Sequence, residues 1–180
     1  ERAHRFRIVW LVAQDAKLRG YSLVQILRFF QKDRQKLLVN FTWWLNRQDA
    51  DGNNVFSGGF LGLDNISPLD RSHLPDGVTL EQADGTAWMA YYALSMLIIA
   101  MVPAEENPVY QDMMVKFVEH FLQIAGALTH QGLYDEADSF FYDRLVHPSG
   151  ESTLVRVRTI AGLIPLLPAV ALPVRGQGAD

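Results

Sequence analysis

The loop GGFLGLDNISPLDR, residues 58–71, places a single carboxylate, Asp64, among glycines and apolar side chains. Asn65 follows the acid directly, Pro68 stiffens the chain after it, and long apolar stretches lie on both sides. A carboxylate in such a loop can exchange a proton or bind a ligand. It can also accept a hydrogen bond from its own loop, as Asp often does in turns, and the residues alone favour this second interpretation.

The turn DADGNN offers hard oxygen ligands at alternate positions, on Asp49, Asp51 and Asn53, and Ca²⁺ prefers such ligands. The EF-hand pattern also requires glycine at its sixth position and an acid at its twelfth, where this chain has Asn54 and Phe60. The sequence therefore does not contain an EF-hand motif. A looser calcium site remains the alternative to a plain polar turn.

Other common catalytic and metal-binding patterns do not occur in the sequence. There is no cysteine, which excludes disulfides, thiolate zinc sites and cysteine nucleophiles. The five histidines show no pairing typical of zinc, and only His73 lies near the acidic loop. The sequence also lacks a glycine-rich phosphate loop and a G-x-S-x-G nucleophile elbow, which disfavours nucleotide binding and serine hydrolysis.

The composition is that of a globular domain, with 180 residues of which 49% are hydrophobic and 20% charged. Basic residues are concentrated in residues 1–36, but apolar residues interleave with them as in an amphipathic helix, so we expect no nucleic-acid partner. The apolar tract 160–174 contains three prolines and is shorter than the roughly 20 residues of a membrane helix. We see no leader sequence and expect a cytoplasmic protein without a membrane span.

Hydrophobic spacing predicts that most of the chain is helical. Apolar residues recur every three or four positions from Leu23 to Leu45, where a turn-forming segment ends the helix. A second helix is expected after Asp84 as its N-cap, and its nearly uniform apolar composition predicts an inner, buried helix. A third begins at Pro108, a residue suited to a first helical turn.

The connection between the first two helices, about residues 48–82, is longer than compact domains usually hold without a functional reason, and it contains Asp64. Residues 132–150 mix aromatic and polar side chains around two turn signals, which predicts a small β-hairpin on the rim. Arg156 and Arg158 alternate in VRVRT, so they would share one face of an extended chain, and salt bridges are their expected role. A last apolar helix follows, and the predicted class is all-α.

Two strings, WWLNRQDADGNNVFSGGFLGLDNISPLDR and LEQADGTAWMAYYALSML, make the chain resemble glycoside hydrolase family 63, the group that contains processing α-glucosidase I. The similarity continues through VRVRTIAGLIPLLP and covers roughly Lys36 to Ala171, whereas residues 1–35 match more weakly as an N-terminal helical segment. Several unusual strings in the same order make the combined pattern specific. The resemblance implies an incomplete (α/α)6 toroid-like array of helical hairpins that hydrolyses α-glucosidic or related α-linked bonds with inversion.

In that family the aspartate of a G-x-D-N loop is the general acid, and the residue that matches it here is Asp64. A general acid must hold its proton near neutral pH, so an apolar environment has to raise its pKa above the usual value of about 3.9. The side chains that could provide this desolvation are Phe60, Leu61, Leu63, Ile66 and Trp88.

The resemblance also makes LEQADGTAW a segment that faces the substrate. The candidate substrate-binding residues are Phe60, Glu81, Gln82, Asp84 and Trp88. The residues by themselves allow another interpretation, in which Asp84 caps a helix, Glu81 interacts with the helix dipole and Trp88 packs in the core.

Inversion needs a second carboxylate that activates water, typically about 6.5 to 9.5 Å from the acid. The resemblance implies that this base is a glutamate farther along the chain than residue 180. We therefore expect residues 1–180 to form one domain, about half of a catalytic domain, which binds an oligosaccharide or a small α-glucoside without a cofactor. The alternative is a non-catalytic helical module that self-associates, or binds a partner, through an exposed apolar face.

Overall fold

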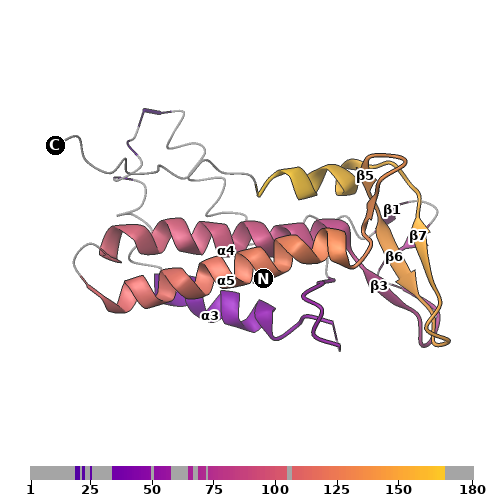
Figure 1. Ribbon diagram of the computed structural model, residues 1–180, viewed down its shortest axis with the longest axis horizontal. Coiled ribbons are helices and arrows are strands. Elements are labelled where there is room, and N and C mark those ends of the chain that lie inside the picture. The colour runs from indigo at the N-terminus through magenta and orange to yellow at the C-terminus, as the bar shows by residue number, and fades with distance from the viewer. Residues whose placement is uncertain are drawn as a thin grey trace.

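The computed structural model describes residues 19–20, 22, 25, 34–49, 51–57, 65–66, 69–71, 73–104 and 107–168. Two long helices, α4 (Ala83–Ala104) and α5 (Val109–His130), lie side by side, and the strands gather at one end of them (Figure 1). A shorter helix, α3 (Arg34–Leu45), packs against α4.

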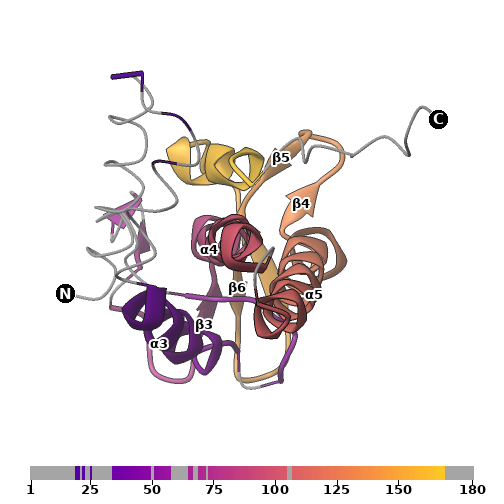
Figure 2. The same cartoon turned by 90° about the vertical axis from the view of Figure 1, so that its left-hand side faces the viewer.

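Helix α4 is the centre of the structure. It contacts α3, α5, strand β6 and the short 3-10 helix η1 (Ile160–Leu166), and the view along its axis shows the other helices around it (Figure 2). Its side chains are buried along nearly the whole length of the helix, which confirms the prediction of an inner helix.

Aromatic contacts join α3, α4 and α5. The ring of Phe41 on α3 meets Tyr92 of α4 edge-on, at 5.2 Å between ring centroids, and Phe117 of α5 at 5.5 Å. The buried Tyr92 hydroxyl lies 2.9 Å from both the Leu37 carbonyl oxygen and Asn40 Oδ1, so it has acceptors on α3. Such edge-to-face pairs contribute about 0.5–1.5 kcal/mol each beyond the area that they bury.

Among the described residues, three small antiparallel sheets lie at one end of the long helices (Figure 1). The first pairs β1 with β2, the second has the order β3-β6-β7, and the third pairs β4 with β5. The strands are β1 (Asn65–Ile66), β2 (Leu69–Asp70), β3 (Thr79–Glu81), β4 (Tyr134–Asp135), β5 (Phe140–Phe141), β6 (Asp143–Val146) and β7 (Ser152–Val155).

The all-α prediction, and with it the (α/α)6 toroid-like array of helical hairpins, is wrong: the described residues form a mixed structure of helices and antiparallel sheets. Strand β3 lies inside the predicted loop of residues 48–82 and pairs with β6, so that Glu81 faces Arg144. A strand of three residues is too short to show an alternating pattern, and its partner is distant in the chain. The hairpin predicted within residues 132–150 is confirmed by the antiparallel β4–β5 pair, which forms a separate sheet.

Two helix boundaries also differ from those predicted. Helix α4 begins at Ala83, so Asp84 lies within its first turn and does not precede the helix as an N-cap. The last apolar segment forms the 3-10 helix η1, which starts after Thr159, whose hydroxyl accepts a hydrogen bond from the Ala161 N–H at 3.2 Å. No helix in the described part of the chain is long and apolar enough to cross a membrane.

Replacing Gly162 in η1 by alanine is expected to lower the free energy of unfolding by about 1–3 kcal/mol. A Cβ at this buried position would collide with the ring of Phe140 and with the backbone oxygen of Phe141. Urea unfolding measures the effect. The matched control is Gly126→Ala in α5, where the added Cβ meets only His130 at ordinary contact distance, so the variant should gain about 0.8–1 kcal/mol of helix propensity. Unchanged stability in Gly162→Ala would contradict this packing.

Candidate functional site

The predicted site residues divide into two groups. Phe60 and Asp64 lie outside the described residues. The backbone that follows Asp64 is described: Asn65 begins β1, which pairs with β2 in the register Asn65 opposite Asp70. The other candidates, Glu81, Gln82, Asp84 and Trp88, lie at the junction of β3 and α4.

Arg71, directly after β2, is at the centre of a buried ion cluster with Asp84 and Asp143. Its side chain is only 2% exposed. Nη1 donates to Asp84 Oδ2 at 3.1 Å, Nη2 donates to Asp84 Oδ1, and Nε lies 3.1 Å from Asp143 Oδ2. A residue that follows the β1–β2 hairpin is thereby tied both to the first turn of α4 and to strand β6.

Backbone groups at the start of α4 complete this cluster. The Ala83 N–H donates to Asp143 Oδ1 at 2.9 Å, and the Gly85 N–H donates to Asp84 Oδ1 at 2.8 Å. The two carboxylates outnumber the single guanidinium. The N-terminus of a helix favours negative charge, so α4 offsets part of the excess.

Burial raises the pKa of Asp143 to about 6. The Arg71 guanidinium opposes this shift, the Asp84 carboxylate adds to it, and the hydrogen bond from the Ala83 N–H opposes it. The folded state therefore binds the proton of Asp143 more tightly than the unfolded chain does.

We expect the Asp143 contribution to stability to be complete below about pH 4 and to disappear as the pH rises through about 6. A shift of about two pKa units corresponds to about 3 kcal/mol. Urea unfolding of the wild type and of Asp143→Asn between these pH values measures this contribution, because the neutral amide of the variant cannot titrate. The stability of the variant relative to the wild type should rise between these pH values, and a constant difference would contradict the assignment.

Glu81 forms a second ion pair with Arg144 across β3 and β6, where the two residues are register partners. Glu81 Oε2 accepts from Arg144 Nη2 at 2.5 Å and from Nε at 2.6 Å, and both side chains are largely buried. Directly opposed residues of neighbouring strands lie on the same face of the sheet, which explains the contact. A sugar contact of Glu81 stays a prediction.

Gln82 and Trp88 are both buried. The Gln82 N–H donates to the Phe56 oxygen at 3.3 Å, and the Gln82 carbonyl accepts from the Thr86 N–H at 3.0 Å. The ring of Trp88 meets Tyr91 edge-on at 5.8 Å. The structure thus gives Trp88 the packing role of the alternative interpretation, whereas sugar binding by either residue stays a prediction.

The DADGNN turn uses its first acid to hold its own backbone. Asp49 Oδ2 accepts from the Asn53 N–H at 3.1 Å and Oδ1 accepts from the Val55 N–H at 3.2 Å. Among the residues that the structure describes, no three or more His, Asp or Glu side chains are grouped so that they could hold a metal ion.

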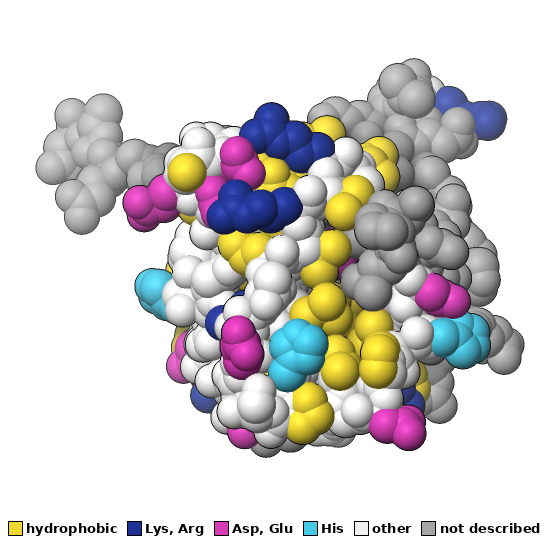
Figure 3. All heavy atoms as spheres, turned by 90° about the vertical axis from the view of Figure 1, so that its right-hand side faces the viewer, with side chains coloured by type: hydrophobic (Ala, Val, Ile, Leu, Met, Phe, Trp, Pro, Cys, Tyr) yellow, Lys and Arg dark blue, Asp and Glu magenta, His cyan; other side chains and the backbone are white. Residues whose placement is uncertain are grey.

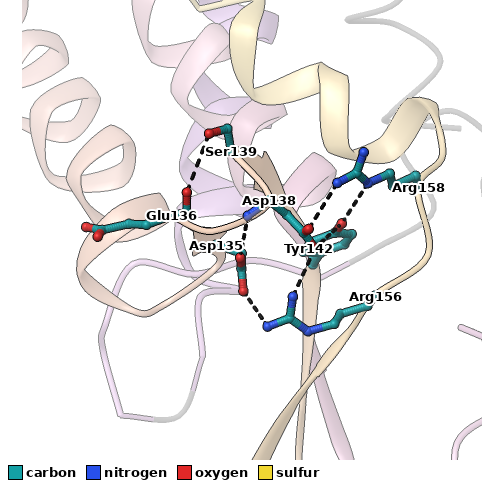
Figure 4. Close-up of polar contacts among 7 residues, drawn as sticks. All are labelled: Asp135, Glu136, Asp138, Ser139, Tyr142, Arg156 and Arg158. Atoms are coloured by element: carbon teal, nitrogen blue, oxygen red, sulfur yellow. Dashed lines mark hydrogen bonds and ion pairs between the residues drawn. The ribbon is translucent and has the colours of Figure 1, made fainter.

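A second polar cluster ties the β4–β5 hairpin to the chain after β7 (Figure 4). Arg156 Nη2 donates to Asp135 Oδ2 at 2.5 Å and Nη1 to Asp138 Oδ2 at 2.9 Å. Arg158 Nη2 donates to Asp138 Oδ1 at 3.0 Å, and the Tyr142 hydroxyl donates to Asp138 Oδ2 at 2.9 Å. The salt bridges predicted for Arg156 and Arg158 are therefore confirmed.

In this second cluster the acidic and basic side chains pair with one another and hold two segments together. The hydrogen bond from Tyr142, together with Arg158 and Arg156, holds the pKa of Asp138 below its usual value. The end of the molecule that carries the strands shows basic and acidic side chains next to one another (Figure 3). Because each guanidinium already has acidic partners, the cluster joins two segments and leaves little free charge for a ligand.

Sequence reasoning did not single out Arg71 or Asp143. They lie in segments read as loop and hairpin, each beside a residue of opposite charge, and the partners that the fold gives them are distant in the sequence. Asp143 accepts a hydrogen bond from the Ala83 N–H, which lies 60 residues earlier in the chain. The one available signal was an arginine at the end of the acidic loop, next to Asp70.

The chain was compared with known proteins. The chain is 47% identical over 161 residues, 80% of its length, to the uncharacterized protein YMR196W of Saccharomyces cerevisiae. No protein-family model matches the chain. The matched region spans only 15% of the yeast protein.

Proposed function

We propose that this chain carries the general acid of an inverting glycoside hydrolase that acts on α-glucosidic or related α-linked bonds. The proposal assigns the acid to Asp64 and the second carboxylate to polypeptide outside these 180 residues. It rests on the resemblance of the GLDN loop and of LEQADGTAW to glycoside hydrolase family 63. The substrate class is an oligosaccharide or a small α-glucoside.

One structural observation supports the proposal more than any other. The two strings that carry the resemblance are joined by the buried pair of Arg71, which closes the acidic loop, and Asp84, which lies in LEQADGTAW. A bidentate pair of this kind fixes distance and orientation together. A contact that sequence reasoning did not foresee thus links Arg71, the last residue of the string assigned to catalysis, to Asp84 in the string assigned to substrate binding.

The geometry gives Asp84 a specific part in the proposed site. Both of its oxygens are already occupied, by Arg71 and by the Gly85 N–H, so a direct bond to a sugar hydroxyl would compete with these partners. In the proposed function Asp84 therefore orients the loop. Phe60, Glu81, Gln82 and Trp88 remain the candidates for sugar contacts.

The proposed chemistry is a single displacement. Asp64 gives its proton to the glycosidic oxygen as the bond from that oxygen to the anomeric carbon breaks. Water attacks the anomeric carbon from the opposite face and loses its proton to the second carboxylate. An α-linked substrate therefore releases the β-anomer of the sugar.

Proton NMR of freshly released sugar tests this function. The purified protein that carries this chain is mixed with an α-linked glucoside, and the anomeric signals are recorded before mutarotation equalises them. The proposal expects β-glucose first, followed by slow appearance of the α-anomer. Initial release of α-glucose would contradict inversion, and the absence of any released sugar across a panel of α-glucosides would contradict the hydrolase assignment.

An exposed apolar stripe on α5 supports a second candidate, a non-catalytic module that self-associates. Val115, Val118 and Leu122 recur at three and four residues on the outer side of the helix, and Leu122 is 62% exposed. Stripes with this spacing commonly pack against another helix. Light scattering of the wild type and of Leu122→Lys distinguishes the candidates: a dimer that the substitution dissociates supports the module, and a monomeric wild type contradicts it.

A further inference from the structure

We propose that Arg71 is a positioning residue for the acidic loop, with Asp84 and Asp143 as its two anchors. The inference rests on the proposed function, since it names the residue that holds the general acid in place. Arg71 itself touches no reacting atom in this account. It acts through the backbone that joins it to Asp64.

The register of the β1–β2 hairpin supplies the connection. Asn65 is paired with Asp70, and Ile66 with Leu69. The chain neighbours beyond the open end of this hairpin are Asp64 on one strand and Arg71 on the other. Asp64, the proposed general acid, is therefore joined by one peptide bond to Asn65, at the end of the hairpin that Arg71 follows.

The contacts of Arg71 fix that end in both position and direction. The guanidinium fork binds Asp84 through two nitrogens on one edge, while Nε faces Asp143. A planar group with partners on two sides cannot turn without breaking at least one of these contacts. Because α4 is buried along nearly its whole length and Asp143 of β6 is buried as well, the end of the hairpin is tied to the core of the described structure.

A buried ion cluster is a costly way to provide stability alone. Both side chains of the Arg71–Asp84 pair are at most 2% exposed, so both charges have lost their water. Well-packed apolar residues of similar volume often stabilise a protein as well or better. An ion cluster adds a defined geometry. A general acid requires such a geometry, because a displacement of about 1 Å can lower a reaction rate about 10²-fold.

The test uses Arg71→Lys and Arg71→Met, with Arg144→Met as the matched control. Arg144 also forms a buried ion pair on β6, but its partner is Glu81 on β3 and not the β1–β2 hairpin. Hydrogen exchange of the backbone amides of the strand residues Asn65, Ile66, Leu69 and Asp70 is the first readout. We expect it to accelerate at least about tenfold in both Arg71 variants, with little change in α5, and to stay at the wild-type rate in Arg144→Met.

Steady-state hydrolysis of an α-glucoside is the second readout. Arg71→Lys is expected to lower kcat about 10²-fold while KM changes little, because the displaced group acts in the chemical step. A purely structural role would not separate kcat from KM at a temperature where the variant is folded. If Arg71→Met fails to fold, the double variant Arg71→Met/Asp84→Asn replaces it, because it leaves no unpaired carboxylate at position 84.

The outcomes separate this inference from the proposed function. Wild-type exchange rates at the strand residues of the β1–β2 hairpin in the Arg71 variants would overturn the anchoring role. Accelerated exchange with unchanged kcat would overturn the positioning of the acid. A wild type that releases no sugar would contradict the proposed function, and the exchange measurement would still decide whether Arg71 holds the hairpin.

Discussion

Asp64→Asn is expected to lower the rate of α-glucoside hydrolysis about 10²- to 10⁴-fold, the usual contribution of a general acid. The amide has nearly the same shape as the carboxyl group, but it has no proton acidic enough to give to a departing glycosidic oxygen. The loss should fall on kcat more than on KM, because the proton moves only in the transition state. Steady-state kinetics with an alkyl glucoside measures it.

The matched control for this variant is Asp70→Asn. Asp70 lies in the same loop, and its carboxylate is exposed and bonded to His73 Nδ1 at 2.9 Å. We expect Asp70→Asn to hydrolyse the substrate at nearly the wild-type rate. Equal losses in the two variants would point to a general disturbance of the loop, and normal turnover in Asp64→Asn would refute the assignment.

Asp84→Ala is expected to lower the free energy of unfolding by about 3–5 kcal/mol, the usual cost of removing one partner from a buried ion pair. The substitution leaves the buried guanidinium of Arg71 without its bidentate partner. Asp143 still faces Nε, but this single contact does not replace the bidentate pairing of Nη1 and Nη2 with Asp84. Urea unfolding near neutral pH gives the value.

The comparison variant for Asp84→Ala is Glu119→Ala on α5. Glu119 pairs with Lys116 at 2.8 Å, and both side chains are at least half exposed. Exposed pairs of this kind contribute about 0–1 kcal/mol, because water and salt screen them. If Asp84→Ala lowered the free energy of unfolding no more than Glu119→Ala does, the buried cluster would not hold the start of α4 as described.

The central helices could be predicted from the sequence because their signals are local. The uniformly apolar composition after Asp84 indicated that α4 is buried, and the proline at position 108 marked the start of α5 to within one residue. The alternation of Arg156 and Arg158 likewise predicted their shared salt bridges. The helix features depend on residues within a few positions of one another, whereas the acidic partners of the two arginines lie 18–21 residues earlier in the chain.

The three-stranded sheet β3-β6-β7 and the buried cluster could not be predicted because they depend on distant partners. Strand β3 has three residues and no pattern of its own, and it becomes a strand only because β6 lies beside it. Asp84 and Glu81 were recognised as special acids, but their partners Arg71 and Arg144 were not. Nothing near either acid in the sequence indicates which arginine the fold will bring to it.

The central claim is that Asp64 gives its proton to the leaving group, and the dependence on leaving-group basicity tests it most directly. Fluoride departs from α-glucosyl fluoride with little need of a proton, whereas an alkoxide departs only when it is protonated. The measurement is the ratio of kcat for Asp64→Asn to kcat for the wild type on each substrate. The account predicts a loss of about 10²- to 10⁴-fold on the alkyl glucoside and a nearly wild-type rate on the fluoride. Equal losses on both substrates would contradict it.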